Sequence, residues 1–269
     1  MIELTSFEEL KSEELKLYSE FSEPQLARFF EPKPGLFIAE SLLVTERAMD
    51  AGFEPWSFLL EKKMAEGEAK KLIGRFPDVP VYVASEDLLK TITGYPVTRG
   101  VLCAMKRKKE KVVEEILEGT KRIVLLEDVE NPTNVGAIFR SAAALGIDAV
   151  LLSKGCADPL YRRAIRVSMG NVFSIPWTFS ENWLADIEKL KNQGFQTIAM
   201  ALKEDSVSMD DLRPEPEERV ALLMGNEGAG LKEETISACH KTVMIPMANG
   251  VDSLNVAAAS AVAFWQIRK

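Results

Sequence analysis

"LLMGNEGAGL", residues 222–231, ends an apolar run in a turn that contains three glycines and one carboxylate. Glycine lacks a Cβ and adopts positive φ values freely, so such turns occur where backbone approaches a ligand closely. An apolar run of this kind is typical of a parallel strand covered on both faces. Ligands of open parallel sheets bind beyond the carboxyl ends of the strands, where this turn lies. We interpret it as part of a binding site, although a tight turn with an exposed Glu227 would also fit.

The glycines of this turn match neither of two common nucleotide-binding motifs. They stand at positions 225, 228 and 230, which is not the G-x-G-x-x-G spacing of dinucleotide-binding sites. No Gly-Lys-Ser/Thr follows, so the turn is not a Walker phosphate loop either. The ligand has to be inferred from other parts of the chain.

Apolar strands alternate with helices along most of the 269 residues, which predicts an α/β layer fold in two units. One or two acidic helices are expected in residues 1–30, followed by four strands and three helices that end near Met105. A second series starts at Arg122. It predicts strands at 122–129, 148–153, 172–177, 195–202, 219–225 and 242–247, and helices at 134–146, 158–170, 181–194, 231–239 and 253–269. The expected domains are therefore 1–105 and 121–269, joined by a charged linker at 106–120.

Two further stretches follow predicted strands of the second series. In "ENPTNVGAIFRSAAALG", residues 130–146, Pro132 blocks continuation of the strand, Asn134 is a suitable N-cap, and Arg140 falls in the second helical turn. A capped helix with a surface arginine would explain Asn134 as well, but it explains Arg140 less well, because the preceding residues 137–139 are apolar.

The last stretch, "IPMANGVDSLNVAAASAVAFW", covers residues 245–265. Asn249-Gly250 signals a turn, and Ser253 or Asn255 can cap the helix that follows. That helix is apolar on nearly every face, so we expect it to be buried on all sides. Because a chain-terminal helix is normally peripheral, a partner subunit or wrapped chain must cover it.

Composition excludes several classes of protein. The chain is 46% hydrophobic with a net charge of −8, which argues against a surface coated for nonspecific nucleic-acid binding. Three cysteines without paired spacing and a single histidine, His240, argue against a metal site and against a Ser–His–Asp triad. No apolar run would span a bilayer and the N-terminus lacks the signal-peptide pattern, so we expect a cytoplasmic protein without membrane or metal partners.

Two locally basic segments remain, "MKRKKEK" at 105–111 and "YRRAIR" at 161–166. The first fits a solvated linker as well as an RNA contact. The second places three arginines on one short predicted helix. The candidate RNA-binding residues are Lys106, Arg107, Lys108, Arg162, Arg163 and Arg166.

The three stretches resemble, in order, motifs 1, 2 and 3 of the SpoU/TrmH family of RNA ribose methyltransferases in the SPOUT superfamily. The resemblance covers residues 122–269, and the first unit more loosely resembles a small, ribosomal-protein-like RNA-binding domain. It implies a C-terminal parallel sheet with a deep trefoil knot, a homodimer, and transfer of a methyl group from S-adenosylmethionine to a ribose 2′-hydroxyl of structured RNA. Ribosomal RNA is favoured over transfer RNA.

The resemblance also implies roles for individual residues. Arg140 acts as the base or stabilises the developing alkoxide, Glu227 holds Arg140 or Asn134, and Ser253 and Asn255 orient the ribose or the cofactor. The catalytic set is thus Asn134, Arg140, Glu227, Ser253 and Asn255. The implied cofactor-binding residues are Met224, Gly225, Asn226, Gly228, Ile245, Met247, Ser253 and Leu254.

Two other classes of function compete with this interpretation. A different nucleotide-dependent enzyme would need a dinucleotide fingerprint in the first strand–helix turn, and none is present. A noncatalytic RNA-binding module would be expected to lack Asn134, Arg140, Glu227 or Asn255, and all four are present.

Overall fold

The chain forms two compact units. The computed structural model describes residues 1–10, 12, 14–93, 100–215 and 217–268. Unit 1 comprises Met1–Lys109 and Leu160–Phe173, and unit 2 comprises Glu110–Pro159 and Ser174–Lys269. The sequence-based ranges placed 160–173 in the C-terminal domain, but in the structure helix α10 of this segment packs against strand β2 of unit 1.

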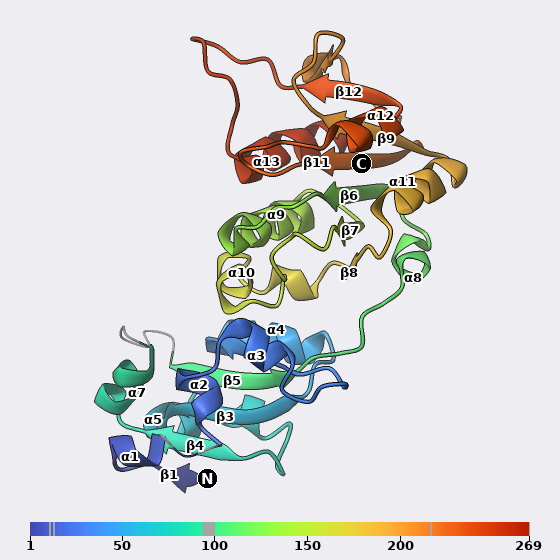
Figure 1. Cartoon of the computed structure of the whole chain (residues 1–269). Coiled ribbons are helices and arrows are strands. Elements are labelled where there is room, and N and C mark those ends of the chain that lie inside the picture. The colour runs from blue at the N-terminus through green and yellow to red at the C-terminus, as the bar shows by residue number, and fades with distance from the viewer. Residues whose placement is uncertain (11, 13, 94–99, 216, 269) are drawn as a thin grey trace. The chain divides into compact units, whose positions relative to one another are not determined.

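Unit 1 is built on a mixed five-stranded sheet with the order β1-β4-β3-β5-β2 (Figure 1). Strand β5 runs antiparallel to both of its neighbours, and the other pairs are parallel. The strands are β1 (Ile2–Glu3), β2 (Leu36–Glu40), β3 (Pro55–Glu61), β4 (Val81–Ala84) and β5 (Val101–Lys106). All five residues of β2 are buried, because helices cover both of its faces.

The helices of unit 1 are short. They are α1 (Phe7–Leu10), α2 (Lys16–Ser19), α3 (Glu23–Ala27), α4 (Leu42–Asp50), α5 (Lys62–Glu66), α6 (Lys70–Ile73), α7 (Glu86–Thr93) and α10 (Arg162–Val167). The expected one or two helices of residues 1–30 are thus a strand and three helices of four or five residues. A glycine commonly ends a helix, but Gly94, which follows α7 in the sequence, lies outside the described residues.

Unit 2 is built on a seven-stranded sheet with the order β10-β12-β9-β11-β6-β7-β8, and all of its strand pairs are parallel. Its strands are β6 (Arg122–Leu126), β7 (Ala149–Leu152), β8 (Trp177–Phe179), β9 (Phe195–Met200), β10 (Val207–Ser208), β11 (Arg219–Met224) and β12 (Lys241–Met244). The prediction of a strand at 172–177 is wrong. A 3₁₀ turn occupies Asn171–Phe173, and β8 begins at the last residue of the expected range.

Strands β12, β9 and β11 are neighbours in the sheet. Because they are parallel, their carboxyl ends lie together at one edge of the sheet. The helices of this unit are α8 (Val113–Leu117), α9 (Pro132–Ala144), α11 (Trp183–Asn192), α12 (Glu233–Ala238) and α13 (Val256–Ile267). Helix α9 begins earlier than expected. Asn131, not Asn134, caps it by accepting a hydrogen bond from the Thr133 amide at 2.9 Å.

Helix α13 is held at its end by a buried arginine. The Arg122 side chain is fully buried, and its Nε donates to the Ile267 carbonyl at 2.5 Å. Its two terminal nitrogens donate to the carbonyls of Glu218 and Glu215. Burial lowers the pKa of Arg122. The guanidinium therefore joins the start of β6, the loop before β11 and the end of the chain.

In the single chain, α13 is buried on one face only. Ala258, Val262 and Trp265 are exposed, the last two at 42% and 59%. Their spacing of four and three residues places them on one face of the helix. The opposite face, which includes Phe264 and Ile267, is fully buried. Among the described residues, no helix is both long and apolar enough to cross a membrane.

Candidate active site

The glycine turn after β11 is a closed loop that its own backbone and one side chain hold in place. The amide of Asn226 donates to the Gly230 carbonyl at 3.1 Å, and the Gly230 amide donates back at 2.9 Å. The Asn226 side-chain oxygen accepts from the amides of Gly228 and Ala229 at 2.8 and 3.1 Å. A Cβ on Gly225 would lie 2.2 Å from the carbonyl carbon of Gly230, so only glycine fits there.

Two carboxylates directly after β6 contact the segment that follows this loop. Glu127 is 1% exposed, and it accepts hydrogen bonds from the Lys232 amide at 2.9 Å and the Thr235 hydroxyl at 2.6 Å. Asp128 forms an ion pair with Lys232 at 2.8 Å, and this hydrogen bond lowers the pKa of Asp128. Both carboxylates fix the chain that leaves the loop. This role was not predicted from the sequence, although a pair of acids directly after an apolar strand was a visible signal.

A chain of three polar side chains connects the three sequence stretches. Asn255 donates through its Nδ2 to Oδ1 of Asn134 at 3.2 Å, and Nδ2 of Asn134 donates to Oε1 of Glu227. Asn255 also caps α13 by accepting from the Ala257 amide at 3.0 Å. Asn134 is 8% exposed, so its amide is held in one orientation. Of the two expected partners of Glu227, Asn134 is the one that it contacts.

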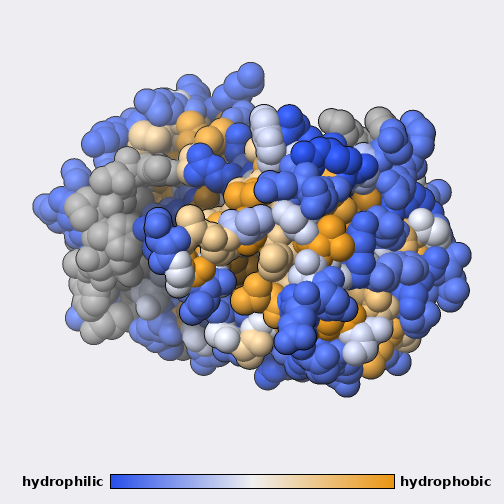
Figure 2. Space-filling model, turned by 90° about the horizontal axis from the view of Figure 1, so that it is seen from above, coloured by the Kyte–Doolittle hydropathy of each residue, from blue (hydrophilic) through white to orange (hydrophobic). Residues whose placement is uncertain are grey.

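A cavity of about 520 Å³ opens beside these hydrogen-bonded side chains, at the carboxyl ends of β9, β11 and β12. All of the candidate cofactor residues line it: Met224, Gly225, Asn226, Gly228, Ile245, Met247, Ser253 and Leu254. The face of unit 2 that carries β12 and the loop after it shows apolar side chains between hydrophilic ones (Figure 2).

One wall of the cavity was not predicted from the sequence. Met200, Ala201, Leu202 and Lys203, which end β9 and follow it, line this wall. The signal was available, because β9 is a parallel strand of the same series and its carboxyl end must lie at the same edge. Lys203 forms an ion pair with Glu233, a second lining residue, at 2.6 Å.

Arg140 is not part of this constellation. It lies on α9 in the third turn, because the helix begins at Pro132, and its side chain is exposed. Arg140 does not line the cavity, and the described hydrogen bonds do not connect it to Glu227. The structure thus brings together four of the five candidate catalytic residues and leaves the arginine on the surface of the helix that carries Asn134.

The candidate RNA-binding residues differ in their surroundings. Arg162 forms an ion pair with the buried Glu40 at 3.0 Å and is 24% exposed, so it serves the packing of α10 in unit 1. Arg163 and Arg166 are exposed on the same helix.

The basic residues at the end of β5 and directly after it are held by other parts of unit 1, to which they belong. Lys106 forms an ion pair with Glu54 at 3.0 Å, Arg107 donates to the Leu36 carbonyl at 3.1 Å, and Lys108 donates to the Ala51 carbonyl at 2.6 Å.

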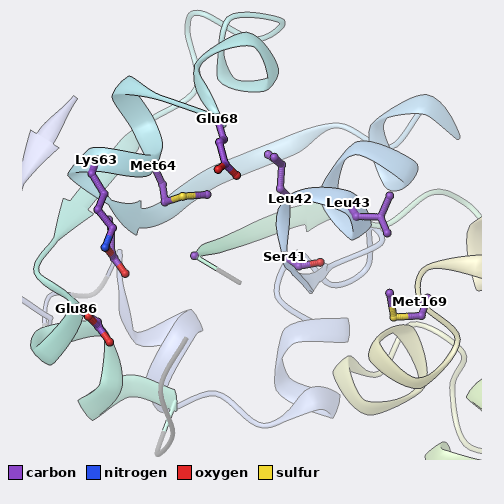
Figure 3. Close-up of a pocket in the computed structure, with 10 residues that line it drawn as sticks. Ser41, Leu42, Leu43, Lys63, Met64, Glu68, Glu86 and Met169 are labelled. Carbon is purple, nitrogen blue, oxygen red and sulfur yellow. The ribbon is translucent and has the colours of Figure 1, made fainter. Parts of the chain in front are cut away.

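Unit 1 has a cavity of its own, of about 580 Å³ (Figure 3). In Figure 3, Leu43 and Met169 lie on one side of this hollow, and Lys63 and Glu86 on the other. Glu61 and Glu68 also line it, and Lys63 forms an ion pair with Glu61 at 2.7 Å. Three carboxylates against one ammonium make this cavity acidic, which does not suit a phosphate ligand. No group of three or more His, Cys, Asp or Glu residues in the described part of the chain is arranged to hold a metal ion.

Fold and site together define an α/β protein with a cavity formed by loops at the carboxyl edge of a parallel sheet, where ligands of such sheets bind. The sequence model of the SpoU rRNA methylase family matches residues 121–265. The chain belongs to this family, as its three motifs predicted.

Relatives and solved structures agree with this assignment. An uncharacterized tRNA/rRNA methyltransferase of Mycobacterium tuberculosis is 39% identical over 233 residues, which cover 86% of this chain and 80% of the relative. The 23S rRNA (guanosine-2′-O-)-methyltransferase RlmB of Acinetobacter baylyi is 30% identical over 193 residues, covering 70% and 77%. The crystal structure of an AdoMet-bound rRNA methyltransferase from Sinorhizobium meliloti aligns with a TM-score of 0.80 at 27% identity, covering 98% and 96%. The predicted fold class, a SPOUT-type sheet preceded by a small α/β unit, is confirmed over nearly the whole chain.

Proposed function

We propose that this protein transfers the methyl group of S-adenosylmethionine to a ribose 2′-hydroxyl of RNA, with ribosomal RNA as the substrate. The observation that carries the proposal is the cavity beside the hydrogen-bonded side chains of Asn255, Asn134 and Glu227. These three side chains bring residues of all three family motifs together in one place. The named relatives that act on ribosomal RNA support this choice of substrate.

The cavity suits S-adenosylmethionine in size and chemistry. Its volume of about 520 Å³ falls in the usual range for small-molecule sites. Gly225 lets the loop close onto Gly230, so that the loop backbone rather than a large side chain forms this wall of the cavity. Ile245, Met247 and Leu254 supply apolar surface for a purine ring, and Asp252 supplies a carboxylate near the opening. When bound, the cofactor would supply a methyl carbon activated by its sulfonium sulfur, which would leave as the thioether of S-adenosylhomocysteine, so no metal would be required.

The protein's own residues position the acceptor and stabilise its charge. Glu227 fixes the amide of Asn134, and Asn134 in turn meets Asn255, so each side chain has one orientation before substrate arrives. Ser253 lines the cavity and is placed to orient the ribose or the cofactor. Arg140 keeps its proposed role at the 2′-oxygen, either as the base or as the cation that stabilises the alkoxide, although it does not line the cavity of the single chain. A guanidinium normally keeps its proton, which favours stabilisation.

The active form is proposed to be a homodimer. Val262 and Trp265 leave an apolar stripe on α13 exposed in one chain, and helix α9, which carries Arg140, packs against the same helix. A second copy would cover the stripe, and a stable interface of this kind buries more than about 2,000 Å² in total. The deep trefoil knot implied by the family stays a prediction. Unit 1 is proposed to bind RNA, and an RNA substrate is consistent with a cytoplasmic location.

Calorimetry with S-adenosylmethionine and NAD, followed by a transfer assay, tests the proposal. We expect binding of the first ligand only, and 2′-O-methylated nucleosides after digestion of the product RNA. Binding of NAD, or a base-methylated nucleoside, would favour another type of enzyme. Cofactor-independent RNA binding without transfer would favour a noncatalytic RNA-binding module.

A further inference from the structure

Unit 1 carries a group of four aromatic side chains at its surface, two of them exposed and two packed partly against the core. Phe29 and Trp56 are 36% and 40% exposed, and the partly buried Phe30 lies between them. The ring centroids of Phe29 and Phe30 are 4.9 Å apart, and those of Phe30 and Trp56 are 5.1 Å apart. Phe21 contacts Phe29 at 5.8 Å. We call these four residues the aromatic platform.

A strand irregularity turns Trp56 outward. The pairing of β3 with β5 shifts its register between Pro55 and Ser57, so Trp56 lies outside the regular ladder. It is the exposed residue in a strand whose other six residues are buried. Bulges of this kind redirect a side chain, and here the indole is directed onto the edge of Phe30.

The turn that carries Phe29 and Phe30 is held by its own backbone. The amide of Glu31 donates to the Arg28 carbonyl at 2.9 Å, and the amide of Lys33 donates to the Phe30 carbonyl at 2.8 Å. A Cβ on Gly35 would lie 2.3 Å from a carbonyl oxygen of α3, so the turn closes tightly onto that helix. The rings are therefore held in place before any ligand binds, which reduces the ordering cost of binding.

Two hollows adjoin the platform and have Phe29 as their shared lining residue. One, of about 600 Å³, is also lined by Phe30, Lys33, Lys106 and Arg107. The other, of about 470 Å³, is also lined by Phe21 and Arg28. An exposed ring between two hollows offers more than one place where a flat group can stack.

The charge around the platform is opposite to that of the whole chain. The two hollows bring together the cations of Arg28, Lys33, Lys106 and Arg107 with one carboxylate, Glu31. The surface stays positive after the ion pair between Lys106 and Glu54 is counted, although the chain carries a net charge of −8. The other cavity of unit 1 has the reverse balance, with three carboxylates and one lysine.

We propose that the aromatic platform binds unpaired nucleotides of the RNA substrate. Bases stack on Phe29 and Trp56, and phosphates lie against Arg28 and Lys33. Aromatic rings interleaved with cations are the recurring surface for single-stranded nucleic acid, because every base has a π face and every link a negative charge. Paired bases do not expose their faces, so the surface selects loops and strand ends. This inference rests on the proposed function and adds the part of the substrate that unit 1 recognises.

The test uses the full-length protein and a fluorescein-labelled dodecamer of uridylate, with fluorescence anisotropy as the measurement. Phe29→Leu keeps apolar volume but loses the flat ring, and we expect binding about 5- to 150-fold weaker. Phe29→Tyr restores the ring and should bind within about twofold of the unmodified protein. Lys33→Ala should reduce the slope of log affinity against log salt by about 0.7, the value for one phosphate of a single strand.

Matched controls lie elsewhere on unit 1. Leu43 is 42% exposed beside the acidic cavity, and Lys62 is an exposed lysine on α5. Leu43→Ala should leave the affinity unchanged, and Lys62→Ala should leave the salt slope unchanged. In addition, RNA should quench the tryptophan fluorescence of the unmodified protein, and Trp56→Phe should remove most of that quenching.

Several outcomes would overturn the inference. The stacking role is refuted if Phe29→Leu binds as tightly as the unmodified protein, or if Phe29→Tyr binds as weakly as Phe29→Leu. Failure of the unmodified protein to bind the dodecamer would indicate a surface for another protein. Methyl transfer to ribosomal RNA, measured with the same protein variants, separates this inference from the proposed function. Binding of the dodecamer through the platform without any transfer to ribosomal RNA refutes the function alone, whereas transfer to ribosomal RNA with an unchanged KM in Phe29→Leu refutes the platform alone.

Discussion

Replacing Gly225 by alanine should open the loop that forms one wall of the proposed cofactor cavity. The added Cβ would lie 2.2 Å from the carbonyl carbon of Gly230 and 2.3 Å from the amide nitrogen of Leu231. Both are backbone atoms, so they cannot rotate away as a side chain would. The loop must move, and the two hydrogen bonds between Asn226 and Gly230 should break first.

The size of the effect follows from those two hydrogen bonds. Each backbone hydrogen bond contributes about 1 kcal/mol, so the loop is destabilised by about 2 kcal/mol. If cofactor binding has to restore the closed loop, that amount weakens its affinity about 30-fold. For a protein of this size, the same destabilisation lowers Tm by about 4–8 °C. Calorimetric titration with S-adenosylmethionine and a thermal melt of Gly225→Ala measure the two quantities.

Gly228→Ala is the matched comparison for the melt. Gly228 lies in the same loop, has an ordinary φ, and its added Cβ would meet only the Asn226 side-chain oxygen at 3.6 Å. Its Tm should be unchanged or slightly higher, because alanine restricts the unfolded chain more than glycine does. The reasoning about the closed loop would be refuted if Gly225→Ala bound the cofactor with unchanged affinity and had the same Tm as Gly228→Ala.

Three other substitutions test the site and its surroundings. Arg140→Ala should bind S-adenosylmethionine normally but transfer about 10²- to 10³-fold more slowly, as calorimetry and a transfer assay would show; transfer at the original rate would remove Arg140 from the chemistry. Trp265→Glu puts a charge on the exposed stripe of α13 and should give a monomer of low activity by light scattering, whereas an unaltered dimer would place the interface elsewhere. Lys232 lowers the pKa of Asp128, so this pair stabilises the fold above the unfolded pKa of about 4, and the contribution is lost as pH falls through the lower folded value. Asp128→Asn should therefore have a lower Tm near neutral pH, and its Tm should fall less than that of the unmodified protein between about pH 5 and pH 2. The same dependence of Tm on pH in both proteins would contradict this.

Much of the fold and site could be predicted from local sequence. Apolar runs located the strands of unit 2 because a parallel strand is buried on both faces and needs no alternation. The strand at 172–177 failed because the apolar residues there pack from a 3₁₀ turn instead. Glycine and asparagine at the loops after β11 and β12 marked backbone that must turn closely, so all of the candidate cofactor residues line one cavity.

Other features depended on contacts between residues distant in the chain. Pro132 made Asn134 a reasonable cap, but Asn131 caps α9, and this frees Asn134 to join Asn255 and Glu227. The wall after β9 has no motif of its own and is part of the cavity because β9 lies beside β11.

The sequence by itself determined the periodicity, the turns and the three motifs, because these depend on neighbouring residues and on side-chain chemistry. Only the tertiary structure decided that Arg122 anchors the end of α13, that one face of this helix stays exposed, and that residues 160–173 pack with unit 1. Each of these depends on which segments meet in space. A helix that is apolar on every face carries no signal that distinguishes its buried side from its exposed one, so its neighbours make that choice.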